Sequence, residues 1–178
     1  MADEKPHDRP LALLLAGGGF WGELQKLLPR LAPDLDRILI VPDGNHALVD
    51  EVEARATLFV RQLIETRASG MNRSPGFWAR EVWRQWRFLR AENPLMVIGL
   101  GSVDCLPTAI ATRLAGIPFV FIETVTRVDD LSATGKLIYR LRLAKRFYVQ
   151  WPGLGKRYPR ALYEGIVHDL GNRGNNPL

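Results

Sequence analysis

Two glycine turns carry the residue types in this sequence that could bind an anion. One of them, Gly99 to Ser102, opens an expected helix. Unpaired backbone N–H groups and the positive end of the helix dipole suit a phosphate or carboxylate there. The next expected strand ends in Glu123 and Thr124, with Arg127 in the loop beyond. We therefore predict these substrate contacts: Gly101, Ser102, Thr124 and Arg127. In the alternative interpretation, the turn only caps a helix and Glu123 is a solvated strand end.

The other turn lies between the apolar run 11–16 and a second expected helix. We predict that it holds a phosphate through the backbone of Gly17, Gly18 and Gly19. The spacing of Gly17, Gly19 and Gly22 also matches the G-x-G-x-x-G dinucleotide fingerprint, and Asp43 follows about 20 residues later. A soluble NAD(P)- or FAD-dependent oxidoreductase is therefore an alternative function.

Two features of the sequence weigh against a bound dinucleotide. Phe20 and Trp21 are bulky at the positions where the fingerprint lets a pyrophosphate approach the backbone. Pro42 precedes Asp43 and disturbs the strand end that should present the acid. We therefore expect the glycine loop to bind some other phosphate, and we expect no cofactor.

Apolar runs of strand length alternate along the chain with segments of helical period. Strands are expected at 11–16, 37–41, 95–100, 118–123 and 146–150, and helices at 21–31, 46–67, 77–92, 102–114 and 132–143. A strand, a crossover helix and another strand form a right-handed unit of a parallel sheet, and both glycine turns then lie at its carboxyl edge. The predicted fold is α/β, a Rossmann-like parallel sheet with helices on both faces.

The composition fits one domain. The chain has 178 residues, of which 47% are apolar. We expect a polar N-terminal arm at 1–10, a single domain at 11–170 and a flexible tail at 171–178. The 24 Lys and Arg residues against 19 Asp and Glu give a net charge of +5, which suits nucleic acid, anionic lipid or a phosphorylated substrate. Because no nucleic-acid-binding motif accompanies this charge, nucleic acid is not an expected partner.

Several other classes of site have no support in the sequence. Cys105 is the only cysteine, so no internal disulfide forms, and the three histidines are scattered without metal-ligand spacing. No metal site is therefore predicted. No apolar run approaches the roughly 20 residues that a membrane span needs, and residues 1 to 10 are polar, so we expect neither a signal peptide nor an anchor.

The segment 77–92 has the most unusual composition, with three tryptophans and four arginines. On a helical wheel, an arginine arc lies beside an apolar arc that contains Trp78, and Trp83 falls among the arginines. Such a face suits a bilayer surface with anionic headgroups. The predicted membrane contacts are Phe77, Trp78, Arg80, Trp83, Arg84 and Arg87. Alternatively, the Trp78 arc only docks on the sheet while the arginines stay in solvent.

A series of short motifs in the second half resembles a known family. In order, they are Phe121-Ile122-Glu123-Thr124, Arg127-Val128, Thr134-Gly135-Lys136-Leu137, Val149-Gln150-Trp151 and the run from Tyr158 to Gly165. Together with the N-terminal glycine loop, they are similar to the acceptor-side subunit of split glycosyltransferases related to glycosyltransferase family 28. The eukaryotic member of that family helps to add the second N-acetylglucosamine to dolichol diphosphate, and bacterial members serve exopolysaccharide assembly.

The resemblance implies half of an inverting enzyme. Such a chain corresponds to the N-terminal half of a GT-B glycosyltransferase, and a separately encoded catalytic chain supplies most of the nucleotide-sugar site. The implied acceptor is a polyprenyl-diphosphate-linked sugar, and the implied location is peripheral, at the cytoplasmic face of the inner membrane. The predicted contacts with the partner are Gln150, Trp151, Tyr158 and Tyr163. A non-catalytic scaffold that recruits a transferase is a further alternative.

The sequence departs from the family at one position of possible catalytic importance. The family's glycine loop typically ends Gly-Gly-His-Trp, and here Phe20 replaces the histidine before Trp21. Because phenylalanine cannot transfer a proton, the general base is either Glu123 or Asp104, or it is supplied by the partner.

Overall fold

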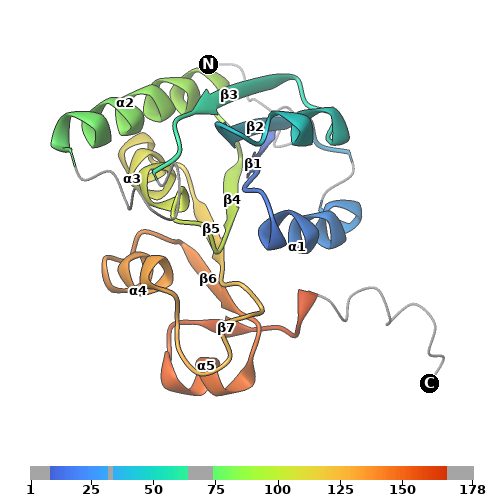
Figure 1. Ribbon diagram of the computed structural model, residues 1–178, viewed down its shortest axis with the longest axis vertical. Coiled ribbons are helices and arrows are strands. Elements are labelled where there is room, and N and C mark those ends of the chain that lie inside the picture. The colour runs from blue at the N-terminus through green and yellow to red at the C-terminus, as the bar shows by residue number, and fades with distance from the viewer. Residues whose placement is uncertain (1–8, 32–33, 64–73, 168–178) are drawn as a thin grey trace, which may run out of the picture.

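A single parallel sheet of seven strands forms the centre of the computed structural model, which describes residues 9–31, 34–63 and 74–167 (Figure 1). The strands are β1 (Leu11–Leu14), β2 (Arg37–Pro42), β3 (Ala56–Val60), β4 (Met96–Leu100), β5 (Phe119–Ile122), β6 (Arg146–Val149) and β7 (Leu162–Tyr163). Their order in the sheet is β3-β2-β1-β4-β5-β6-β7. Most of the predicted N-terminal arm and the whole predicted tail at 171–178 lie outside the described residues.

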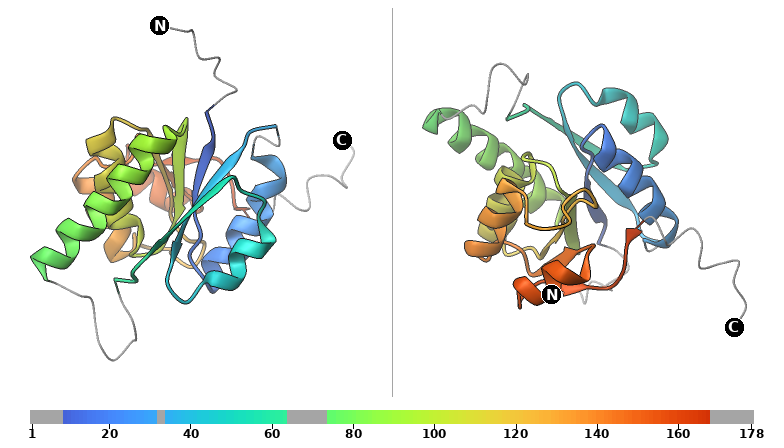
Figure 2. Two further views of the ribbon diagram at one scale, coloured as in Figure 1. Left: turned by 90° about the horizontal axis from the view of Figure 1, so that it is seen from above. Right: turned by 60° about the horizontal axis from the view of Figure 1, so that its bottom comes forward.

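Helices cover the sheet from both sides. The α-helices are α1 (Gly19–Leu27), α2 (Pro75–Glu92), α3 (Cys105–Ala115), α4 (Ala133–Arg140) and α5 (Pro152–Arg157), and the short 3-10 helices are η2 (Leu28–Arg30) and η3 (His46–Glu51). Figure 2 shows α1 and η3 against one face of the sheet, with α2 and α3 against the other. The α/β class predicted from the sequence is confirmed.

The strands form where the sequence has continuous apolar runs. All four residues of β1 are buried, and five of the six residues of β2 are buried. A strand with helices on both faces has no solvent side, so it needs no polar alternation. One apolar cluster lies under α2 to α5 and a second lies under α1 and η3.

One part of the predicted element pattern is wrong. A helix was expected at 46–67, but the chain forms η3 and then β3, which pairs with β2 from Ile38↔Ala56 to Pro42↔Val60. The last predicted strand, at 146–150, is confirmed as β6. Pro152 then begins α5, a helix not predicted from the sequence, at a first-turn position where proline loses no intrahelical hydrogen bond.

The two glycine turns lie beside each other at the centre of the sheet. β1 and β4 are neighbouring strands, with Leu11 opposite Met96. From β1 the chain crosses through α1 to β2, and from β4 it crosses through α3 to β5 on the other side. This reversal is the switch point at which α/β proteins usually bind ligands, at the carboxyl ends of the strands.

Candidate functional site

The amino-terminal end of α1 is open to solvent. Gly18 is the N-cap residue with φ +66°, no side chain caps the helix, and Gly18 and Gly19 are exposed. The first N–H groups of a helix have no intrahelical partner, so this nine-residue helix presents free donors and a positive dipole end. The predicted phosphate loop Gly17 to Gly19 thus has the geometry of an anion site.

The amino-terminal end of α3 is used differently. Ser102 is buried and donates its hydroxyl to Asp104 Oδ2 at 3.0 Å, while Asp104 Oδ1 accepts the Leu63 backbone N–H at 3.0 Å. Burial raises the pKa of Asp104 above its ordinary value. The position predicted for a ligand anion beside Ser102 is therefore occupied by the chain's own carboxyl group. Asp104 is 9% exposed, so a substrate molecule has little access to its carboxyl group.

Close contact between the two glycine turns depends on Gly101. This residue has φ +49°, and a Cβ atom at its position would lie 2.5 Å from Phe20 Cε1 and 3.1 Å from Thr124 Cβ. The ring of Phe20 therefore lies over the β4–α3 turn, and the end of β5 packs beside it. The segments that follow β1, β4 and β5, which carry predicted ligand residues, therefore meet at Gly101.

Glu123 is fully buried, with 0% of its surface exposed. One carboxylate oxygen, Oε2, accepts both the backbone N–H and the hydroxyl of Ser132 at 2.9 Å, and the other accepts the Thr124 backbone N–H at 3.1 Å. Ser132 is the N-cap of α4, and a side chain at Gly135 would collide with the same carboxylate. Burial raises the pKa of Glu123, and these hydrogen bonds oppose that shift. The geometry favours a role in holding α4 on the sheet.

A second buried carboxylate, Glu23, was not identified from the sequence. It lies on α1 and accepts the Thr124 hydroxyl at 2.7 Å and the Gln150 side-chain amide at 2.5 Å. Gln150 also donates to the carbonyl oxygen of Glu123 at 2.9 Å. Glu23 therefore ties α1 to the carboxyl ends of β5 and β6. Its sequence spacing does not distinguish it from a solvated helix residue, because both of these partners are more than 100 positions away.

The loop after β5 carries the exposed polar groups of this edge. Thr126, Arg127 and Asp129 are exposed, and the Arg127 backbone N–H donates to the Thr124 carbonyl at 3.1 Å. With the described residues, the Arg127 side chain forms no ion pair. Its guanidinium is thus available to an anionic ligand, while Thr124 is buried and bonded to Glu23.

The predicted membrane contacts fall into two groups. Phe77 and Trp78 are half-buried and pack against the apolar cluster under α2, and Arg84 donates to the Phe59 carbonyl at 2.9 Å. The others are exposed: Arg80, Trp83 and Arg87 lie along the outer side of α2, where the Arg87 guanidinium stands 4.9 Å from the centre of the Trp83 ring. Trp83 is 53% exposed, so this stripe is not explained by packing.

Three of the four predicted partner contacts are engaged within the chain. Gln150 is buried, the Trp151 indole N–H donates to the Val125 carbonyl at 2.6 Å, and the Tyr158 hydroxyl bonds to Asp130. Tyr163 is 42% exposed on the edge strand β7. Of this set, Tyr163 has the largest exposed fraction.

The dinucleotide pattern has weak support in the packing. The third glycine of such a fingerprint lets the helix approach the strand, but a Cβ atom at Gly22 would meet nothing within 4 Å. A side chain at the first glycine, Gly17, would collide with the Asn45 amide. Gly17 therefore makes room for Asn45, and Gly22 does not serve a tight contact between helix and strand.

In the described ranges 9–31, 34–63 and 74–167, no helix has the length and apolar content to cross a bilayer. They also contain no group of three or more histidine, cysteine, aspartate or glutamate side chains arranged to hold a metal ion.

Comparison with known protein families gives a match in the C-terminal half. Residues 88–167 match the family model described as "Oligosaccharide biosynthesis protein Alg14 like". The human UDP-N-acetylglucosamine transferase subunit ALG14 is 31% identical over 92 residues, which is 48% of this chain and 42% of the human protein. The chain therefore aligns with less than half the length of that relative. The Yarrowia lipolytica subunit of the same name is 24% identical over 90% of this chain and 82% of its own length.

Comparison with solved structures identifies the fold. MurG of Acinetobacter baumannii has a TM-score of 0.65 and 18% identity, covering 82% of this chain and 42% of that protein. The UDP-N-acetylglucosamine 2-epimerase of Rickettsia bellii has the same TM-score with 14% identity, covering 93% of this chain and 47% of that protein. The seven-stranded parallel sheet thus resembles half of a GT-B glycosyltransferase, an architecture that the epimerase shares.

Proposed function

We propose, from the Alg14-like segment at 88–167, that this chain is the acceptor-side subunit of a two-chain inverting glycosyltransferase. The enzyme would transfer N-acetylglucosamine or a related sugar from a UDP-sugar to a polyprenyl-diphosphate-linked acceptor in exopolysaccharide assembly. A separate catalytic chain would bind most of the donor. The similarity to ALG14 subunits and the size of the domain, equivalent to half of a GT-B enzyme, support a two-chain arrangement.

The observation that carries the proposal is the exposed amino-terminal end of α1 at the switch point. The helices α3 and α4 each have a buried carboxylate and a serine hydroxyl at the first turn, while α1 begins at exposed Gly18 and Gly19 with no side-chain cap. A diphosphate needs several N–H donors and a cation. Gly18 and Gly19 supply the donors, and Arg127 on the nearby β5–α4 loop supplies the cation.

The burial of Glu123 and Asp104 supports one of the two alternatives for the general base. Both carboxyl groups accept hydrogen bonds from their own chain and have little or no contact with solvent. A base must reach the acceptor hydroxyl directly or through one water molecule. We therefore favour a subunit that positions the acceptor while the partner contributes the base.

The membrane contact of the proposed subunit would lie on the outer side of α2. Arg80 and Arg87 flank the exposed Trp83, and this combination of cation and indole suits the headgroup region of an anionic bilayer. The location would be the cytoplasmic face of the inner membrane, with the chain bound peripherally.

The decisive test is reconstitution of transfer from UDP-N-acetylglucosamine to a polyprenyl-diphosphate-linked sugar. The chain alone should be inactive, and addition of the separately encoded donor-binding chain should give turnover. With both chains present, Arg127→Gln should lower kcat/KM by roughly 10- to 100-fold, because a charge-assisted contact to phosphate contributes about 1.5–3 kcal/mol. The matched control is Arg61→Gln, an exposed arginine after β3. Turnover by this chain alone would refute the two-chain proposal.

The oxidoreductase alternative predicts that this chain alone binds a nicotinamide cofactor. Asp43 does lie directly after β2, as a ribose-binding acid would, but it is paired with His46 at 3.9 Å and the fingerprint glycines lack the expected packing. Titration with NADH, followed by fluorescence, should give no saturable binding. Tight binding that Asp43→Asn weakens would favour the oxidoreductase.

A further inference from the structure

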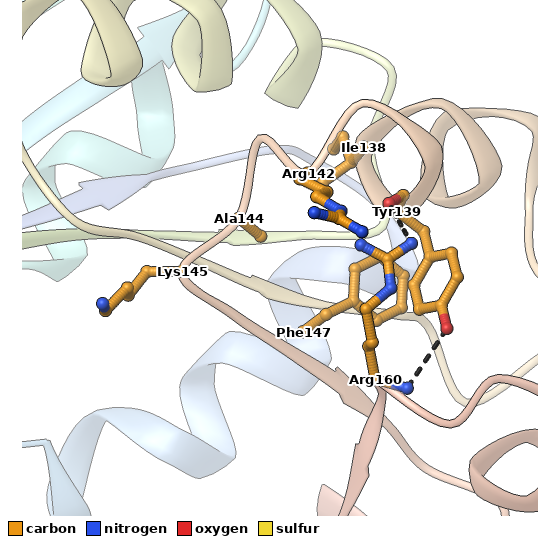
Figure 3. Close-up of a pocket in the computed structure, with 7 residues that line it drawn as sticks. All are labelled: Ile138, Tyr139, Arg142, Ala144, Lys145, Phe147 and Arg160. Atoms are coloured by element: carbon orange, nitrogen blue, oxygen red, sulfur yellow. Dashed lines mark hydrogen bonds between the residues drawn. The ribbon is translucent and has the colours of Figure 1, made fainter.

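Three adjoining cavities lie at the amino edge of the sheet, away from the glycine turns. The first is ≈350 Å³ and is lined by residues of α4, the α4–β6 turn, β6 and Arg160 (Figure 3). The second, of ≈410 Å³, shares Arg142, Ala144 and Lys145 with the first. The third, of ≈310 Å³, shares Ile117 with the second and extends to Arg90 at the end of α2. We call the three together the amino-edge groove.

The amino-edge groove is lined by positive charge alone. Its ionisable lining residues, apart from Tyr139, are Arg90, Arg113, Arg142, Lys145 and Arg160, with no aspartate or glutamate. None of these five forms an ion pair with a described residue. A cavity beside β2 and β3 on the same edge is different, because Arg37 and Arg55 line it together with Asp34, Asp36 and Glu53. Unpaired cations gathered in a hollow attract an anion.

Helix dipoles explain only part of this charge. Arg90 and Arg113 lie in the last turns of α2 and α3, where a cation offsets the negative end of the dipole. Lys145 and Arg160 lie beyond any helix end. Arg160 is held over the Tyr139 ring at 4.1 Å and donates to the Tyr139 carbonyl at 2.9 Å, and Figure 3 shows its guanidinium on the same side of the cavity as that of Arg142.

Arg142 is held in a backbone conformation that normally requires glycine. α3 and α4 both end in the same turn, with two backbone hydrogen bonds back into the helix, at Gly116 in one and Arg142 in the other. Gly116 has φ +72°, and Arg142 has φ +52°. A side chain in this left-handed region is strained. An arginine at this position therefore costs stability that a glycine would not.

Two large apolar side chains are exposed beside these cations. Leu114 and Leu141 are 64% and 61% exposed, and each is adjacent in sequence to a groove cation, Arg113 or Arg142. A soluble phosphate would contact the cations but leave both leucines in water. A bilayer interface would accommodate both kinds of side chain, with phosphates at the arginines and leucines at the acyl boundary.

We propose that the amino-edge groove binds the phosphate groups of anionic phospholipids and forms a second membrane contact beyond α2. The inference rests on the proposed function for the choice of a membrane as partner. Arg90 connects the two surfaces, because it lies both in the groove and at the end of the exposed α2 stripe of Arg80, Trp83 and Arg87. The groove therefore extends the membrane-facing surface from one helix to three helix ends.

Vesicle binding by the full chain alone tests the proposal. The chain should bind phosphatidylcholine vesicles that contain phosphatidylglycerol and not vesicles of phosphatidylcholine alone. Arg142→Gln with Lys145→Gln should weaken binding roughly 25-fold, since each cation near an anionic surface contributes roughly fivefold. The matched control, Arg61→Gln with Lys156→Gln, removes the same charge from exposed positions outside the groove. Equal losses in the two double variants would overturn the proposal.

Two further variants separate the possible sources of phosphate and show whether a loss of binding comes from unfolding. Leu114→Gln with Leu141→Gln keeps every cation, so it should weaken vesicle binding and leave binding of inorganic pyrophosphate unchanged. If pyrophosphate binds the groove and vesicles do not, the lipid assignment is wrong.

Arg142→Gly removes the charge and the strain together, so its thermal midpoint should be at least that of the parent while vesicle binding falls. Because no partner or sugar is present, these results do not depend on transferase turnover, which the reconstitution assay measures separately.

Discussion

At the scale of single residues, the contact between the two glycine turns depends on Gly101. Gly101→Ala should lower the free energy of unfolding by about 2–4 kcal/mol, because alanine at φ +49° is strained and its Cβ would meet the Phe20 ring. The control is Gly116→Ala, at φ +72° with nothing within 4 Å, which should cost only about 1 kcal/mol. Urea unfolding measures both values, and equal losses would contradict a role for the Phe20 contact.

The buried carboxyl group of Glu123 gives stability a specific pH dependence. Burial raises its pKa above the ordinary value of 4.5. The folded state therefore binds the proton more tightly than the unfolded chain, and the free energy of unfolding falls as pH rises from about 4.5 through the raised pKa. Glu123→Gln removes this titration, so its unfolding free energy should vary less with pH in that window.

Unfolding of this variant in urea at a series of pH values provides the measurement. Asp104 also has a raised pKa and acts with the same sign, so the slope should be reduced and not abolished. Glu51→Gln, an exposed carboxylate, is the control and should keep the parent slope. A Glu123→Gln slope as steep as the parent's would contradict the explanation. The same variant, assayed with the partner, tests Glu123 as the base.

Sequence reasoning at this scale identified which residues meet but not what they do. Gly101, Thr124 and Glu123 were named from their positions at expected strand ends, and the sheet does bring those ends together. The contacts of Glu123 with Ser132 and of Glu23 with Gln150 depend on how the side chains pack after folding. No local pattern encodes such contacts, so their burial was not foreseen.

At the scale of elements, Glu23 attaches α1 to two strands. Glu23→Ala should lower the free energy of unfolding by about 2–4 kcal/mol, because it leaves the buried donors of Thr124 and Gln150 without their acceptor. Glu51→Ala loses only a surface hydrogen bond with Gln25 and should change stability by less than about 0.5 kcal/mol. Chemical denaturation compares the two, and a small loss for Glu23→Ala would show that α1 is held by apolar packing alone.

At the end of α4, a substitution should raise stability and not lower it. Arg142→Gly should raise the free energy of unfolding by about 0.5–1 kcal/mol, because glycine adopts φ +52° without strain. Thermal unfolding, compared with Arg146→Gly as a control in an extended strand, provides the measurement. A lower midpoint for Arg142→Gly would mean that its side chain stabilises the turn.

The wrongly predicted helix at 46–67 shows where periodicity misleads. Leu48, Val52, Phe59 and Leu63 have helical spacing, but Thr57 to Val60 is also a short β-branched and aromatic run beside β2. Pairing with β2 decided the outcome, as tertiary contacts often override local preference. The start of α5 was legible, since Pro152 at a first-turn position is a known helix signal.

At the scale of the whole molecule, the parallel sheet could be predicted because its strands are buried on both faces. Continuous apolar runs at β1, β2, β4 and β5 mark such strands, and the alternation with helices fixes a parallel order. The amino-edge groove could not be predicted in the same way. Its cations come from α2, α3, the α4–β6 turn and Arg160, which are separated along the chain and meet only in the folded sheet.

Charge is unevenly distributed along the amino edge of the sheet. The cavity beside β2 and β3 carries both signs, with Asp34, Asp36 and Glu53 beside Arg37 and Arg55, while the amino-edge groove beside β5 and β6 is lined by cations without a carboxylate. Such an asymmetry gives the molecule an electric dipole moment along that edge. In the field of an anionic surface the dipole experiences a torque, so the protein should rotate its basic end toward the lipid before contact. The rate of association with phosphatidylglycerol vesicles, measured by stopped flow, should therefore fall steeply as salt shortens the Debye length.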